Sequence, residues 1–219
     1  MDPRLSALAR DLQRIFGARL QSLVTYGDPA DPDDVHTLVL VERLSFEDLT
    51  ACAPHVSGWQ RAGLAVPLLL SRVEFVRTLD VFPIEYGYII ATHTLISGDA
   101  PFAGLSIREA DLRRACELQT KSHLIHLREG YLESSGQTGR IGGMMAASAP
   151  ALRALVGNLD RLEPGTAERA GMTTAFVDEI AAAGDTTIAD PSALLSRYID
   201  TVARLWEEVD TWRGDTDGL

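Results

Sequence analysis

The sequence predicts an α/β (α+β) half followed by an all-α half within one chain of 219 residues. Short β-branched and apolar runs, such as TLVLV at residues 37–41, alternate with helical patterns in the first half. Beyond about residue 105 the apolar residues recur only at helical spacing. We therefore predict an α/β domain over residues 1–105 and an all-α helical bundle over residues 106–219.

Strand patterns are confined to the first half. Residues 37–41 are continuously apolar, which suits a strand covered on both faces. The acidic, proline-containing run before them fits only a turn or loop. In chain order, the predicted extended segments are residues 21–26, residues 37–41, part of residues 64–76, two pieces of residues 77–92 separated at Pro83, and a last piece ending at Gly98.

Helical patterns occur in both halves. Ser45 and Asp48 form the S-x-x-D variant of a capping box, so a short helix is expected to begin there. The glycine-rich residues 139–143 lack the ending of a phosphate-binding loop and favour close helix packing. The predicted helices cover residues 3–20, a segment from Ser45, part of residues 64–76, and residues 107–132, 139–157, 166–183 and 191–212.

Charge and cysteine content restrict the function class. The formal net charge of −11, from 31 acidic and 20 basic residues, argues against general nucleic-acid binding, which needs a basic face. Cys52 and Cys116 are too few for a disulfide framework or a zinc site, so both are predicted to be buried. No signal-peptide or membrane-spanning pattern is present, and we expect a cytoplasmic protein without a membrane partner.

Residues 22–41 carry the most informative motif. An apolar lead-in reaches Tyr26 and Gly27, an acidic loop follows, and a strand opens at Asp34-Val35-His36. This order of elements resembles the nucleotidyltransferase fold of the DNA polymerase β superfamily. Many members, including aminoglycoside nucleotidyltransferases, also carry a C-terminal helical domain. The resemblance implies a mixed sheet in the first domain.

The same resemblance implies a phosphate and metal site. In the family a Gly-Ser turn holds the nucleotide phosphates, and an Asp-x-Asp on the next strand holds two metal ions. Here the serine position is Asp28 and the second aspartate position is His36. Asp34, His36 and Asp80 are the candidate metal ligands, with Asp80 as the third carboxylate from a later strand. Glu85 is the second choice and a candidate base.

Both replacements weaken the chemistry. Histidine is a poor substitute for a hard oxygen ligand of Mg²⁺, the ion expected if the site is active. A carboxylate at Asp28 would repel phosphate oxygens. Gly27, Asp28 and His36, with Lys121 and His123 of the long predicted helix, are the candidate ligand-binding residues.

Each candidate site residue also has an explanation that involves no function. The aspartates of residues 28–34 suit a solvated turn. Asp80 and Glu85 each interrupt an apolar stretch, so burial against an arginine such as Arg72 or Arg77 is slightly favoured over a cleft. A polar stripe on a helix surface is the commoner explanation for His123 and His126.

The sequence therefore predicts a nucleotidyltransferase-like protein with a degenerate catalytic site. It would bind a nucleotide, a small polar ligand or a protein partner. The alternative is an active metal-dependent nucleotidyltransferase acting on a small hydroxylated acceptor, with Asp34, Asp80 and Glu85 catalytic. Membership of a two-component pair and formation of a homo-oligomer stay open.

Overall fold

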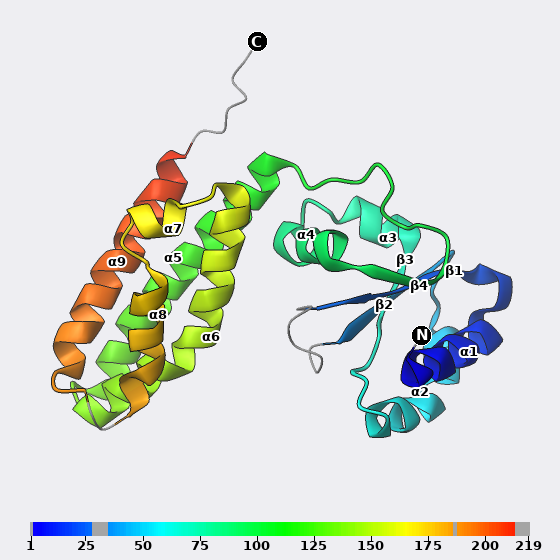
Figure 1. Ribbon diagram of the computed structural model, residues 1–219, viewed down its shortest axis with the longest axis horizontal. Helices are drawn as coiled ribbons and strands as arrows, with labels where there is room; N and C mark the ends of the chain where they lie inside the picture. Colours follow the sequence, from blue (N-terminus) through cyan, green and yellow to red (C-terminus); the bar gives the residue numbers. More distant parts are fainter. Residues whose placement is uncertain (1, 28–34, 186–187, 213–219) are drawn as a thin grey trace, which may run out of the picture. The chain divides into compact units, whose positions relative to one another are not determined.

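The computed structural model describes residues 2–27, 35–185 and 188–212. Asp28 and Asp34, two of the predicted site residues, lie outside the described residues. The chain divides into two compact units, Met1–Ile107 and Arg108–Leu219 (Figure 1). The boundary predicted from the sequence fell after residue 105.

The first unit is built on a four-stranded mixed sheet. Its strands are β1 (Leu20–Tyr26), β2 (His36–Val41), β3 (Leu68–Ser71) and β4 (Thr94–Gly98), in the spatial order β3-β2-β1-β4. β1 pairs antiparallel with both β2 and β4, whereas β2 and β3 are parallel. The predicted mixed sheet is confirmed.

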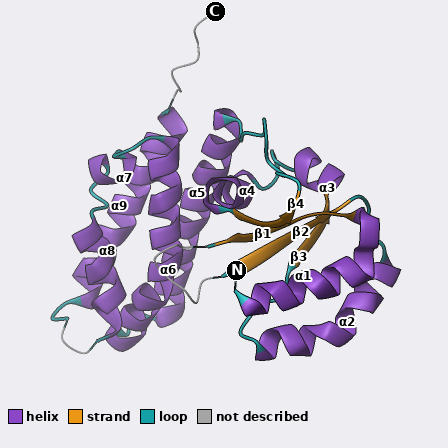
Figure 2. Ribbon diagram, turned by 45° about the vertical axis from the view of Figure 1, so that its right-hand side comes forward, coloured by secondary structure: helices purple, strands orange, loops and turns teal. Residues whose placement is uncertain are grey.

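Helices cover both faces of this sheet, as Figure 2 shows. Leu23, Val39 and Val41 belong to the core formed with α1 (Pro3–Phe16) and α2 (Phe46–Arg61). Their strand neighbours face the opposite core, which α3 (Arg72–Arg77) and α4 (Pro83–Thr92) cover; they are Val24, Leu38 and Leu40. Burial on both faces explains why β2 is continuously apolar.

The capping box predicted at Ser45 is present. The Ser45 hydroxyl accepts from the Asp48 amide, and the Asp48 carboxylate accepts from the Ser45 amide. Arg19, in the 3₁₀ turn Gly17–Arg19, donates two hydrogen bonds of 2.9 and 2.6 Å to Asp48. This start supports a helix of 16 residues, longer than the short one expected.

Residues 77–92 differ from the prediction. α3 ends at Arg77, a turn follows, and α4 begins with Pro83 at its first position, where a missing N–H costs nothing. Tyr86 and Ile89, three residues apart, bury one face of α4 against the sheet. The expectation of two extended pieces was wrong because helical spacing within this apolar stretch was overlooked.

Two candidate carboxylates therefore lie in other elements than predicted. Asp80 lies exposed in the turn after α3, and Glu85 lies exposed in the first turn of α4. Neither belongs to a strand. Among the described residues neither forms an ion pair, so the predicted burial against Arg72 or Arg77 was wrong.

The second unit is helical throughout its described residues. α5 (Glu109–Ser134), α6 (Thr138–Leu162) and α9 (Pro191–Thr211) pack together. The single pattern predicted over residues 166–183 is interrupted at Gly171, whose φ of 89° ends the helical path. It comprises α7 (Thr166–Arg169), α8 (Thr174–Ala181) and the 3₁₀ turn Ala182–Gly184.

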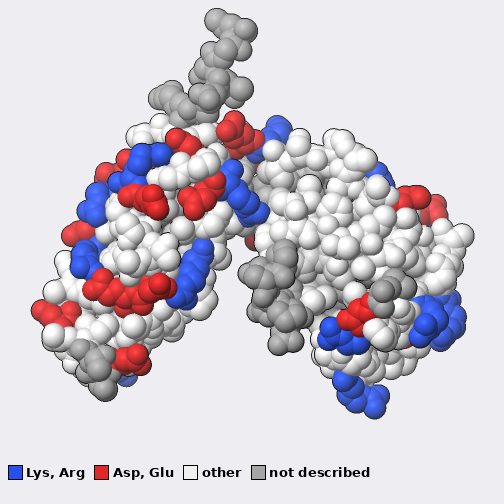
Figure 3. All heavy atoms as spheres, viewed as in Figure 1, with Lys and Arg blue, Asp and Glu red and all other residues white. Residues whose placement is uncertain are grey.

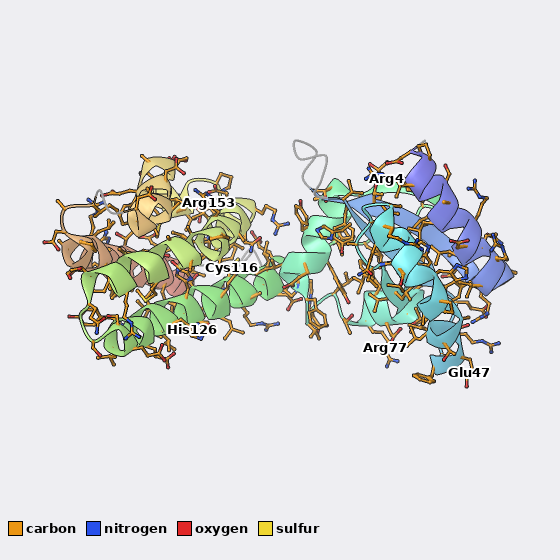
Figure 4. All side chains as sticks on the ribbon, turned by 90° about the horizontal axis from the view of Figure 1, so that it is seen from below. Arg4, Glu47, Arg77, Cys116, His126 and Arg153 are labelled. Atoms are coloured by element: carbon orange, nitrogen blue, oxygen red, sulfur yellow. The ribbon has the colours of Figure 1, made fainter. Side chains whose placement is uncertain are left out.

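Close packing at α6 and burial of the cysteines were both predicted correctly. A Cβ on Gly142 would overlap the carbonyl oxygen of Ala183, so only glycine lets α6 approach that backbone. Cys52 and Cys116 are buried free thiols, and Figure 4 shows Cys116 on α5. Among the described residues, no helix is long and apolar enough to cross a membrane.

Candidate functional site

The candidate site lies where β1 ends and β2 begins. Tyr26 and His36 are register partners across these strands, and their rings stack with centroids 5.5 Å apart at 25°. Gly27 follows with a φ of 148°, a region that favours glycine. The predicted turn glycine therefore stands directly beside an aromatic pair.

His36 lies on the face of the sheet that α3 and α4 cover. Strand alternation puts it on the same side as Leu38 and Leu40, and Tyr26 packs against that core. His36 is itself exposed, because it lies at the strand end. Asp34 lies outside the described residues, so its convergence with His36 stays a prediction.

The later strands supply no carboxylate to this edge. β3, the direct neighbour of β2, has the sequence LLLS, and β4 has the sequence TLISG. Asp80 and Glu85 lie in a turn and a helix instead. Among the described residues, no group of three His, Cys, Asp or Glu side chains could hold a metal ion. The metal set Asp34, His36 and Asp80 stays a prediction.

The sequence interpretation missed His93. It precedes β4, whose Thr94 pairs with Thr25, so His93 reaches the same edge of the sheet as Tyr26. Its Nδ1 lies 2.8 Å from the Ile90 carbonyl oxygen, and its ring meets the Phe102 ring edge-on at 4.7 Å. A histidine directly before a strand was the available signal.

Lys121 and His123 have partners within the helical unit. The Lys121 Nζ lies 3.6 Å from the centroid of the Trp206 ring, a cation–π contact. His123 Nε2 lies 2.5 Å from the Tyr198 hydroxyl, which lies 3.1 Å from the Ser148 hydroxyl. Their predicted roles in ligand binding stay predictions.

The hydrogen-bond chain through Tyr198 has one direction. Ser148 donates its proton to the Met145 carbonyl at 2.7 Å, so its oxygen must accept from Tyr198. Tyr198 has then used its only proton and must accept from His123 Nε2–H. The chain thus ties α5, α9 and α6 together and assigns the His123 tautomer.

The environment of His123 makes the stability of the helical unit sensitive to acid. Desolvation, with the nearby His126, lowers the pKa of His123 to about 4. The unfolded chain, with a pKa near 6.5, therefore binds the proton first as pH falls. Between pH 6.5 and 4 we expect a loss of about 3 kcal/mol of unfolding free energy.

In the His123→Gln variant this loss of unfolding free energy between pH 6.5 and 4 should be much smaller. Urea unfolding curves followed by circular dichroism at several pH values measure it. His55→Gln, on α2 of the other unit, is the control and should keep the same loss of unfolding free energy between pH 6.5 and 4. An unchanged pH dependence in His123→Gln would contradict the assignment.

Comparison with known proteins supports the fold. No family model and no curated protein matches the chain. A solved structure does match, that of spectinomycin adenyltransferase AAD(9) from Enterococcus faecialis with ATP and spectinomycin. The TM-score is 0.51 at 11% sequence identity, covering 94% of this chain and 98% of that one. The chain therefore has a nucleotidyltransferase-like fold with a C-terminal helical region.

Proposed function

We propose that this protein binds a nucleotide or another small polar ligand at the β1–β2 edge without transferring a nucleotidyl group. Two-metal transfer requires converging carboxylates that neutralise the attacking and leaving oxygens. The observation that carries the proposal is the absence of any carboxylate on β3 and β4, the strands that flank β1 and β2.

Two features of the same edge add support. His36 offers an imidazole where a hard oxygen ligand is needed for Mg²⁺. Its ring, stacked on Tyr26, presents an aromatic surface at the exposed end of the sheet. Such a surface suits contact with a planar or polar ligand.

Charge argues against a nucleic-acid ligand. The chain carries a net charge of −11. On the face shown in Figure 3, acidic and basic side chains of the helical unit alternate. A polyanion needs a continuous basic face, so a small ligand is the better fit.

Calorimetric titration tests the proposal. ATP, GTP and spectinomycin are titrated separately, with Mg²⁺, with Mn²⁺ and with EDTA. We expect saturable binding of at least one ligand, with a Kd that metal changes less than twofold. Release of pyrophosphate from ATP, abolished by Asp34→Asn, would establish the active transferase instead.

Two substitutions at one position sharpen the test. His36→Ala should weaken binding about fivefold, the value of one aromatic ring contact. His36→Asp restores a carboxylate and should make nucleotide binding depend on Mg²⁺. His55→Ala on α2 is the matched control and should bind like the parent. Equal affinity in His36→Ala would remove His36 from the site.

A further inference from the structure

A cavity of about 360 Å³ lies within the helical unit between α8 and α9. Arg197, Thr201 and Arg204 line it from α9, at the spacing of one helix face. Gly171 and Thr173 line it from the segment that leads into α8, and Phe176 lines it from α8 itself. Two guanidinium groups therefore line one cavity of an acidic chain.

Arg204 is held in place by one backbone and one side-chain acceptor. Its Nε donates to the Ala170 carbonyl at 3.2 Å, and its Nη2 donates to the Thr201 hydroxyl at 2.9 Å. A guanidinium has five N–H donors, so these two bonds leave others for a ligand. An anchored guanidinium loses less side-chain entropy on binding an anion.

Arg197 is held by a different pair of contacts. Its guanidinium carbon lies 4.5 Å from the centroid of the Phe176 ring, and its Nη2 donates to the Glu179 carboxylate. Glu179 also lines the cavity and neutralises part of its positive charge. The two arginines still outnumber the one acid there, which leaves a net positive cavity.

The remaining wall adds hydroxyl groups and space. The Thr173 hydroxyl accepts from the Phe176 amide at 3.2 Å, so its own proton can be donated. Gly171 contributes no side chain, and a Cβ there would lie 3.5 Å from Arg204 Nη2. The glycine thus keeps the guanidinium accessible from the cavity.

We propose that this cavity binds the phosphate group of a small molecule. Planar guanidinium groups match phosphate oxygens, and two anchored ones with adjacent hydroxyls give a convergent set of donors. The volume is larger than one phosphate requires and lies at the lower end for small-molecule pockets. The ligand is therefore a phosphorylated compound of modest size, and the site is independent of the β1–β2 edge.

Titration with inorganic phosphate, pyrophosphate and AMP at constant ionic strength tests the site by calorimetry. Saturable binding of at least one probe is expected, and AMP binding more tightly than phosphate would identify a nucleotide as the source. Arg204→Gln should weaken the bound probe about tenfold or more. Glu179→Gln removes the competing carboxylate and should tighten binding severalfold.

The matched control is Arg153→Gln. Arg153 lies on α6 (Figure 4) in an exposed ion pair with Asp178 at 3.0 Å and does not line this cavity. It should bind like the parent, and circular dichroism should show that all variants fold. Absence of saturable binding, or equal affinity in Arg204→Gln and the parent, would overturn the proposal.

Discussion

Replacing Gly98 by alanine is expected to destabilise the α/β unit by about 3 kcal/mol or more. Gly98 ends β4 with a φ of 88°, a region that costs energy for a residue with a Cβ. That Cβ would also overlap the Gln21 carbonyl oxygen and lie 2.9 Å from the Ser22 Cα. Both are backbone atoms of β1, so the strands must separate.

Urea unfolding measured by circular dichroism gives the free-energy loss. Gly104→Ala is the control, because Gly104 has a φ of 76° and no described atom lies within 4 Å of its Cβ position. Its unfolding free energy should fall only by the cost of a positive φ for alanine, about 1 kcal/mol. If both variants lost the same amount, contact with β1 would not be the cause.

Replacing Tyr198 by alanine should cost the helical unit about 3–5 kcal/mol. Tyr198 is fully buried, and its ring packs against the rings of His123 and Phe176. Truncation leaves a cavity between α9 and its neighbours α5, α6 and α8. It also leaves the half-buried His123 and Ser148 without their shared partner.

Tyr198→Phe separates volume from hydrogen bonding. It keeps the ring and removes the hydroxyl, so a loss of about 1–3 kcal/mol is expected. Urea unfolding of the two variants and the parent measures the contribution of the ring and that of the hydroxyl to the unfolding free energy. A phenylalanine variant as stable as the parent would show that the hydrogen-bond chain contributes nothing, and an alanine variant as stable would contradict the packing argument.

Much of the fold was predictable because its signals are local. The apolar run at residues 37–41 requires burial on both faces, and β2 has it. The capping box at Ser45 depends on a spacing of three residues and was found as expected. The loss of strand patterns after residue 105 marked the helical unit, whose long helices follow.

Errors arose where local patterns were ambiguous. Residues 77–92 are rich in β-branched and aromatic residues, which favour strands, yet Tyr86 and Ile89 complete a buried helix face on the sheet. Tertiary packing overrode propensity there. As a result Asp80 and Glu85 were expected on or beside strands, and both are exposed elsewhere.

The sequence by itself determined the strands β1 and β2, the helical character of the second half, and the turn glycine and histidine of the β1–β2 edge. These depend on residue type and spacing along the chain. Only the tertiary structure decided which side chains meet. It brought His93 to the sheet edge at which Tyr26 lies and placed His123 against Tyr198. It also joined Arg197 and Arg204 to a cavity. Contacts between residues far apart in sequence leave no periodic signal, because packing alone selects them.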